Sequence, residues 1–304
     1  MTSPEPTTGL RPARSDGVIH DIGYRHYSGE RLDRRYITRS LFVSSLRGAF
    51  GLGRSGRSKV LPMLIAAAMV LPAIVIVSVI NFAKLDEQPL PYSRYALVVQ
   101  LVIVIFLASQ APQLVSRDLR FRTITLYFAR PLERIDYVTA KFAAMTSALL
   151  IITAAPLLVL YVGGLLAGLP FWRETSDVAG ALLGVVVLSL LLGGLGLVFA
   201  ALTPRRGFAV AIVIVVMLVS YGATNILAAV AWEEGSRDFA GWVGLLSPIT
   251  LFDGVQVWAF GAETSAVAPP PGTIGGITFC AVALGCIAGS FVALLVRYRK
   301  LAAA

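Results

Sequence analysis

The chain has 304 residues, of which 57% are hydrophobic and 14% are charged. Soluble domains carry about 25% charged residues, so the composition excludes an ordinary water-soluble globule. The 26 Lys and Arg residues outnumber the 17 Asp and Glu residues and give a net charge of +9. In a soluble protein this charge would suggest nucleic-acid binding, but in so apolar a chain the distribution of charge is more informative. We expect no nucleic-acid partner.

Residues 1–59 form a polar and basic tail. We expect no signal peptide here and a cytoplasmic N-terminus, because no short apolar stretch precedes a cleavage site. Apolar residues recur along one helical face with arginines between them, which predicts an interfacial helix at the inner membrane surface. Ordinary packing in the cytoplasm is the alternative. The predicted face consists of Leu32, Tyr36, Val43, Leu46 and Phe50, and it leaves out Ile37 and Leu41.

A glycine-rich linker joins the tail to the first apolar stretch. Gly51, Gly53 and Gly56 fit the G-x-G-x-x-G pattern, and residues 51–58 nearly fit a P-loop with Arg57 in the lysine position. Both patterns bind phosphates between a strand and a helix of an α/β unit, whereas this segment precedes a membrane span. We interpret it as a linker that faces anionic headgroups. We expect the chain not to be an enzyme, with no catalytic residue and no ATP hydrolysis of its own.

Six stretches are long enough to cross a membrane. A helix needs about 20 apolar residues to cross the hydrocarbon core, and helices satisfy the backbone polar groups there. The stretches lack Asp, Glu, Lys and Arg and are Val60–Ala83, Tyr95–Ser116, Phe142–Trp172, Val178–Pro204, Gly207–Trp232 and the part of Thr264–Val296 after Pro271. We predict an all-α polytopic membrane protein with six transmembrane helices, formed by residues 60–304.

The basic residues determine the expected orientation. Of the 26 Lys and Arg residues, 22 fall in the tail, in alternate connections or after the last span, all on one side of the membrane. Lys and Arg are retained on the cytoplasmic side, so we predict cytoplasmic N- and C-termini in a multi-pass protein of the cell (plasma) membrane. Trp prefers the membrane interface, and the expected outer ends carry Trp172, Trp232, Trp242 and Trp258.

Residues 239–262 are apolar enough for a seventh span. However, they contain Pro248 and Asp253, and a crossing there would move the basic C-terminal end to the outer side. A charge in mid-membrane costs about 2.5 to 3.5 kcal/mol. We therefore predict a re-entrant or outer-surface helical hairpin before the last span.

The inner connection at residues 116–141 combines charges with many apolar residues. Pro131 suits the first position of a helix, and a helical repeat with an apolar and a charged side follows it. This pattern predicts an amphipathic helix along the membrane that presents its charged side to a cytoplasmic partner. A helix that merely joins two spans is the alternative. The apolar side has Leu132, Ile135, Val138 and Phe142, and the charged side has Glu133, Arg134 and Asp136.

The same connection carries a resemblance to a known family. The sequence S-R-D at residues 116–118, then L-Y-F-A-R-P-L-E-R-I-D-Y at residues 126–137 and Lys141, resembles permease subunits of ABC-2 type ABC transporters. Other segments, similar to an actinobacterial branch of that family, are residues 17–36, 45–63 and 246–261.

By this resemblance, the connection is a coupling element that docks on a separate cytoplasmic ABC ATPase. That partner would hold ATP and Mg²⁺, while this chain holds no cofactor and no metal. A second permease subunit, identical or different, would complete the transporter. The implied coupling residues are Arg117, Asp118, Arg120, Arg122, Tyr127, Arg130, Pro131, Leu132, Glu133, Arg134, Asp136 and Tyr137.

The six spans contain no Asp, Glu, Lys, Arg or His. Ion-coupled carriers use ionisable residues or broken helices near mid-membrane, so we expect the energy to come from another subunit. Candidates for the translocation path, or alternatively for interhelical hydrogen bonds, are Gln100, Gln110, Gln113, Thr153, Tyr221, Thr224 and Asn225. Small residues that allow close helix contacts within or between subunits are Gly193, Gly194 and Gly196 and the pairs Gly164/Gly168, Gly180/Gly184 and Gly285/Gly289.

These expectations favour the permease subunit of an exporter for a hydrophobic or amphiphilic substrate, with the export direction implied by the resemblance. A non-transporting membrane scaffold that recruits a cytoplasmic partner is the alternative. An intramembrane enzyme ranks below both, because His20 and His26 are the only histidines and both lie in the tail. Cys280 and Cys286 lie in one apolar run and lack metal-ligand spacing.

Overall fold

The computed structural model describes Gly29 and residues 32–53, 55–116, 118, 132–203 and 205–301. The chain divides into two compact units, residues 1–32 and 33–304, and the second unit contains all the helices described below. Regular structure in the described ranges is helical throughout, with no strand. This confirms the prediction of an all-α protein.

Five helices are long and apolar enough to cross a membrane. At a rise of 1.5 Å per residue, even the shortest, with 27 residues, is about 40 Å long and exceeds the hydrocarbon core of about 30 Å. The chain is therefore a multi-pass membrane protein. The five are α2 (Arg57–Ala83), α7 (Arg134–Leu166), α8 (Phe171–Ala201), α9 (Arg206–Glu233) and α12 (Gly272–Leu301).

The second predicted span is not one straight helix. It consists of α3 (Tyr92–Val98) and α4 (Gln100–Leu114), which meet at a bend of 59° and make a sixth span if counted together. Tyr92 and Tyr95 are buried, and their hydroxyls donate hydrogen bonds to Glu174 in α8 and to the Met69 carbonyl in α2. These tertiary contacts hold α3 at its own angle, and apolar length alone does not reveal them.

The third span differs from its predicted bounds at both ends. α7 begins at Arg134 rather than Phe142 and ends at Leu166, because Gly168 adopts a left-handed φ of 93° before α8 begins. The amphipathic segment after Pro131 is consequently not a separate helix, at least from Arg134 onward. Its residues form the first turns of α7, since its apolar repeat continues in phase into the span.

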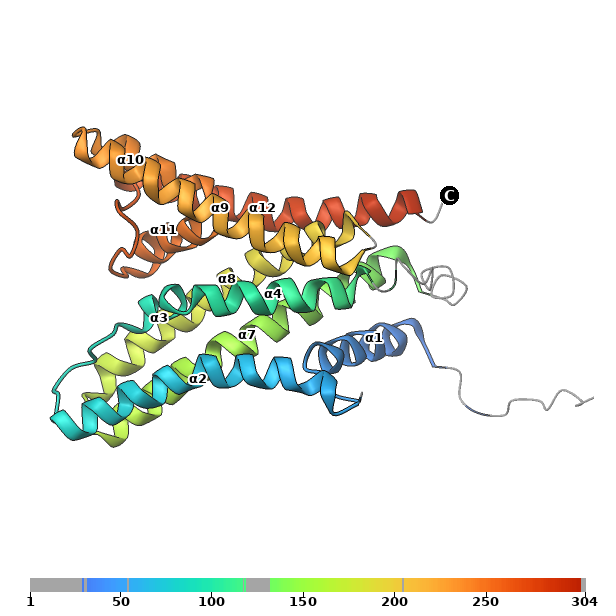
Figure 1. Cartoon of the computed structure of the whole chain (residues 1–304), viewed down its shortest axis with the longest axis horizontal. Coiled ribbons are helices and arrows are strands. Elements are labelled where there is room, and N and C mark those ends of the chain that lie inside the picture. The colour runs from blue at the N-terminus through green and yellow to red at the C-terminus, as the bar shows by residue number, and fades with distance from the viewer. Residues whose placement is uncertain are drawn as a thin grey trace, which may run out of the picture. The chain divides into compact units, whose positions relative to one another are not determined.

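α8 and α7 form the centre of the bundle (Figure 1). In the most apolar 18-residue window of each helix, 56% of α8 and 44% of α7 is buried, against 17% to 22% of α2, α9 and α12. The outer helices instead expose large apolar side chains along their length. A water-soluble protein rarely exposes such continuous apolar surface, so these faces are suited to contact lipid.

Glycines of α8 permit three close contacts within the chain. A Cβ at Gly193 would lie 3.2 Å from the Thr146 hydroxyl of α7, one at Gly194 would lie 2.2 Å from the Ser290 hydroxyl of α12, and one at Gly196 would lie 2.4 Å from Leu107 of α4. The glycine cluster therefore packs α8 against neighbours in the same subunit. By contrast, nothing lies within 4 Å of a Cβ placed at Gly285 or Gly289.

The segment before the last span is a short helical hairpin. It comprises α10 (Arg237–Val243), a 3₁₀ turn (Gly244–Leu246) and α11 (Pro248–Phe260). The 13 residues of α11 extend about 20 Å, which is too short to cross the hydrocarbon core. Every residue from Ile249 to Gln256 is buried, because α11 packs against α8 and α12. α11 therefore packs into the bundle, whereas Phe239 of α10 and Leu246 of the 3₁₀ turn are exposed.

Asp253 of α11 holds the loop that follows the hairpin. Its carboxylate accepts hydrogen bonds from the backbone N–H groups of Ser265 and Ala266, at 3.0 and 2.9 Å, and from the Thr264 hydroxyl. Asp253, whose charge argues against a seventh span, thus accepts hydrogen bonds from the loop at the end of the bundle. This connection leads directly into α12.

The bundle has two ends, which we call the α1 end and the α10 end. α1 (Arg34–Ala49) and the C-terminal turns of α12 lie at the α1 end, whereas α10 and the connection before α3 lie at the α10 end (Figure 1). The described residues of the connection between α4 and α7 also lie at the α1 end. This placement agrees with an even number of crossings between α1 and the last residues of α12.

A helix is present where the tail pattern predicts one, but it packs through a different face. Leu41, Ser45 and Ala49 of α1 are buried against α7 and α4, although the predicted apolar face leaves out Leu41. Tyr36 and Val43 of the predicted face are exposed. The sequence repeat indicates that the helix has an apolar and a polar side. Which side is buried depends on the neighbouring helices α7 and α4.

Candidate functional site

The candidate site is the connection between α4 and α7 at the α1 end. Six of its predicted coupling residues lie outside the described ranges, namely Arg117, Arg120, Arg122, Tyr127, Arg130 and Pro131. The structure describes the other six, which flank the connection on both sides. Its geometry is therefore that of the two anchor points, Asp118 on the α4 side and residues 132–137 on the α7 side.

A buried ion pair joins the two anchor points. The Lys141 ammonium of α7 lies 2.9 Å from Oδ2 of Asp118, and the two side chains are 9% and 14% exposed. The Tyr137 hydroxyl donates a 2.7 Å hydrogen bond to the same oxygen. Because a buried charge is tolerated only with such partners, the α4 side of the connection is held firmly to the start of α7.

The last helix completes this cluster. Tyr298 of α12 is 1% exposed, and its ring packs edge-on against Tyr137 with the centroids 5.0 Å apart. The Lys141 ammonium also lies 5.4 Å from the centre of the Tyr137 ring. Asp118, Tyr137, Lys141 and Tyr298 thus form one buried cluster, which we call the α4–α7–α12 cluster.

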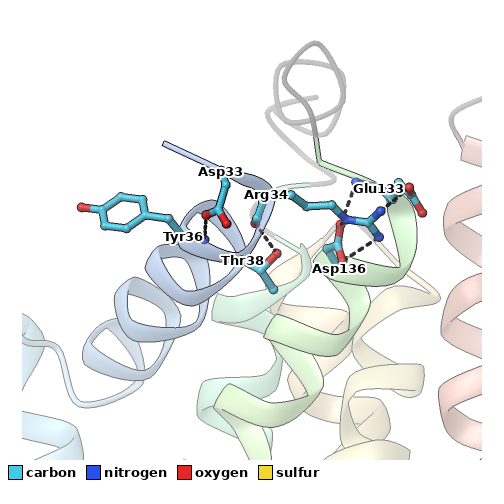
Figure 2. Close-up of polar contacts among 6 residues, drawn as sticks. All are labelled: Asp33, Arg34, Tyr36, Thr38, Glu133 and Asp136. Carbon is cyan, nitrogen blue, oxygen red and sulfur yellow. Dashed lines mark hydrogen bonds and ion pairs between the residues drawn. The ribbon is translucent and has the colours of Figure 1, made fainter. Parts of the chain in front are cut away.

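A second, more exposed group ties α1 to the first turn of α7 (Figure 2). The backbone N–H of Glu133, the N-cap of α7, donates to the Asp136 carboxylate at 3.0 Å, as in a capping box. The Arg34 guanidinium donates to both oxygens of Asp136, at 2.6 and 3.0 Å, and also to Glu133. The hydrogen bond with Asp136 is the main cause that raises the pKa of Arg34.

Arg34 itself is placed by the start of α1. Asp33 is the N-cap of this helix, and its carboxylate accepts from the backbone N–H of Tyr36 at 3.1 Å. The Thr38 hydroxyl donates to the Arg34 carbonyl one turn later (Figure 2). A guanidinium matches a carboxylate in a two-bond geometry, so the α1–α7 contact has a defined orientation.

The remaining described coupling candidates differ in exposure. Leu132 is 5% exposed and belongs to the core, whereas Arg134 is exposed at the first position of α7. Leu132 is therefore a packing residue, and Arg134 is available to a partner. Sequence reasoning missed Arg34, Lys141 and Tyr298 as members of the site. Their charge and hydroxyl groups are visible in the sequence, but their partners lie far along the chain.

The candidates for a translocation path do not form one group. Thr153 and Asn225 donate to carbonyls of their own helices, at 2.8 Å each. Gln110 is buried and donates to the neighbouring Ser109 hydroxyl. Gln100 lines a small cavity of about 10 Å³ between α4, α8 and α11. The other candidates are Gln113 and Tyr221, which are partly buried, and Thr224, which is fully buried.

The described residues offer no evident metal centre, since no group of three His, Cys, Asp or Glu side chains among them could hold a metal ion. The described contacts of the site are ion pairs, hydrogen bonds and ring contacts between helices. Such groups are suited to transmit a displacement of the connection to α1, α4, α7 and α12.

Fold and site together define a multi-pass helical membrane protein with an internally braced connection at the end where α1 lies. No model of a known protein family matches the chain. No curated protein matches it either.

Proposed function

We propose that the chain is the transmembrane permease subunit of an ABC-2 type exporter, driven by separate cytoplasmic ATPase subunits. The observation that carries this proposal is the bracing of the connection between α4 and α7. Its two ends are joined by the Lys141–Asp118 ion pair, and Arg34 links its α7 side to α1. A partner that pushes on residues 119–131 would therefore move several helices together.

The apolar spans support the same proposal. The six predicted spans contain no Asp, Glu, Lys, Arg or His, so an ion gradient has no evident charged site in them through which to act. An external energy source acting at the α1 end is the simplest arrangement for such a bundle, which would switch between two packings. In this proposal the α1 end faces the cytoplasm, a second permease subunit completes the pathway, and the substrate is hydrophobic or amphiphilic.

Arg134 provides a direct test, because it is exposed at the start of α7. The chain should be purified and reconstituted in proteoliposomes with an ABC ATPase of the same organism. We expect Arg134→Ala to lower the ATPase activity stimulated by the permease while assembly of the bundle is kept. Arg206→Ala is the matched control, since Arg206 is also exposed at this end but is the first residue of α9.

Two results would reject the proposal. Equal ATPase activity with and without the chain would show that the two proteins are not coupled. Coupled ATPase activity without flux of any amphiphilic test substrate would favour the membrane scaffold that recruits a cytoplasmic partner. Equal behaviour of the Arg134 and Arg206 variants would reject Arg134 as a coupling residue and leave the permease assignment to the flux measurement.

A further inference from the structure

A cavity of about 230 Å³ lies at the α10 end, between α3, α8 and α11. Drug-sized ligands occupy sites of about 300–1,000 Å³, so this cavity suits a smaller chemical group. Its wall is acidic, and Arg173 is the single Lys or Arg among its described lining residues. The carboxylates that line it belong to Glu87, Glu174, Asp177 and Glu263.

Glu174 is the buried carboxylate of this wall. It is 3% exposed, and its Oε2 accepts a 2.5 Å hydrogen bond from the Tyr92 hydroxyl. No described residue donates to the other oxygen, Oε1. Oε1 is not fully enclosed, so part of its surface is accessible. Because Glu174 lines the cavity, this accessible surface of Oε1 belongs to the cavity wall.

Gln88 lines the same cavity, but its amide oxygen is fully enclosed. Its amide nitrogen donates to the Tyr92 hydroxyl at 3.0 Å and to the Leu160 carbonyl at 3.4 Å. These donations assign the nitrogen, and the amide oxygen is then buried without a partner among the described residues. A buried acceptor without a donor is destabilising. Gln88 and Glu174 meet at the Tyr92 hydroxyl, and each has one oxygen that lacks a donor.

The basic side chains near the cavity are engaged elsewhere. Arg173 donates to Glu87 at 2.9 Å, and both side chains are mostly exposed at the rim. Arg94 lies 4.0 Å from Glu263 and donates to the Thr264 carbonyl. Neither guanidinium forms a hydrogen bond with Glu174. The first turn of a helix favours a carboxylate, and Glu174 lies in the first turn of α8.

We propose that this cavity binds a primary ammonium group, R–NH₃⁺. Such a group has one positive charge and three N–H donors, which match the acidic wall and the accessible Oε1 acceptor of Glu174. A quaternary ammonium has the charge but no donor. A metal ion fits less well, because no three acidic, His or Cys side chains among the described residues are grouped closely enough to hold one.

The ammonium group has two sources, the ethanolamine headgroup of a lipid or a free amine in solution. Tyr92 and Phe260 also line the cavity, and their rings suit the carbon atoms next to the nitrogen. Binding at this cavity does not depend on the proposed transport function. It requires only the arrangement of α3, α8 and α11 at the α10 end.

The test uses the full chain in nanodiscs of phosphatidylglycerol, which contains no amine. Ethanolamine should bind in a calorimetric titration, and choline should bind at least about tenfold more weakly because it offers no N–H donor. Glu174→Gln should weaken ethanolamine binding by about tenfold, since it replaces a charge-assisted hydrogen bond. The matched control, Glu234→Gln, removes an exposed carboxylate that follows α9 and does not line the cavity, and it should leave affinity within about twofold.

Choline that binds as tightly as ethanolamine, or equal losses in the Glu174 and Glu234 variants, would overturn the proposal. If Glu174→Gln fails to fold, the ethanolamine and choline comparison on the unaltered protein decides the question. Nanodiscs of phosphatidylethanolamine separate the sources. A lipid ligand should abolish ethanolamine binding there and co-purify with the chain, whereas a soluble ligand should bind equally in both nanodiscs. Absence of both ethanolamine binding and co-purified lipid would also overturn the proposal.

Discussion

Replacing Lys141 by Met tests the buried cluster that braces the connection. The substitution keeps the length and apolar stem of the side chain but removes the ammonium that lies 2.9 Å from Asp118. Removing one partner of a buried ion pair costs about 3 to 5 kcal/mol. We expect about 3 kcal/mol, the lower end, because the Tyr137 hydroxyl still donates to the Asp118 carboxylate.

Thermal unfolding of the purified chain in detergent, followed by helical circular dichroism, measures this effect. A loss of about 3 kcal/mol corresponds to a midpoint lowered by about 5 °C for a chain of this size. The double variant Asp118→Asn with Lys141→Met should recover much of that loss, because neither charge is then left without its partner. Lys59→Met is the control, since Lys59 is exposed in the first turn of α2.

An unchanged midpoint in Lys141→Met would refute the reasoning, because a buried carboxylate cannot lose its ammonium partner without cost. A double variant no more stable than Lys141→Met would also contradict it. In that case the loss would come from the packing of the lysine stem and not from its charge.

Three further predictions follow from the packing. Gly196→Ala should lower the unfolding midpoint, because the new Cβ would lie 2.4 Å from Leu107. The control Gly285→Ala meets nothing within 4 Å and should raise stability by about 0.5 to 1 kcal/mol through helix propensity. Equal midpoints of the two variants would contradict the close contact at Gly196. Arg34→Ala should loosen α1 from α7, seen as faster hydrogen exchange in α1 and unchanged exchange in α9; uniform exchange would contradict the link through Asp136. Asp253→Asn should increase protease cleavage near Ser265, because the amide replaces one of two oxygens that accept from the loop, and unchanged cleavage would show that these bonds do not hold it.

Part of the site could be predicted from the sequence. The charged and apolar repeat after Pro131 identifies the start of α7 as an element with two sides, and Asp136 and Tyr137 indeed make specific contacts there. The partners of these residues could not be predicted. Arg34 lies 102 positions before Asp136, and Tyr298 is on the last helix. No local sequence spacing therefore relates these two residues to the segment between α4 and α7.

The sequence by itself determined that the chain is a bundle of long apolar helices, because hydrocarbon length and backbone hydrogen bonding leave a stretch of about 20 apolar residues no other stable conformation. It also marked the hairpin before the last span, since Pro248 and Asp253 interrupt an apolar run. These are properties of single segments, and each follows from local composition.

Only the tertiary structure decided the bend at Val99, the face through which α1 packs, the central position of α8 and the acidic cavity at the α10 end. Each depends on side chains from several helices that approach one another in space. Apolar residues are equally suited to face lipid or a neighbouring helix, so hydropathy cannot distinguish these surroundings. The roles of buried polar groups such as Glu174 and Lys141 depend on the partners that the fold places beside them.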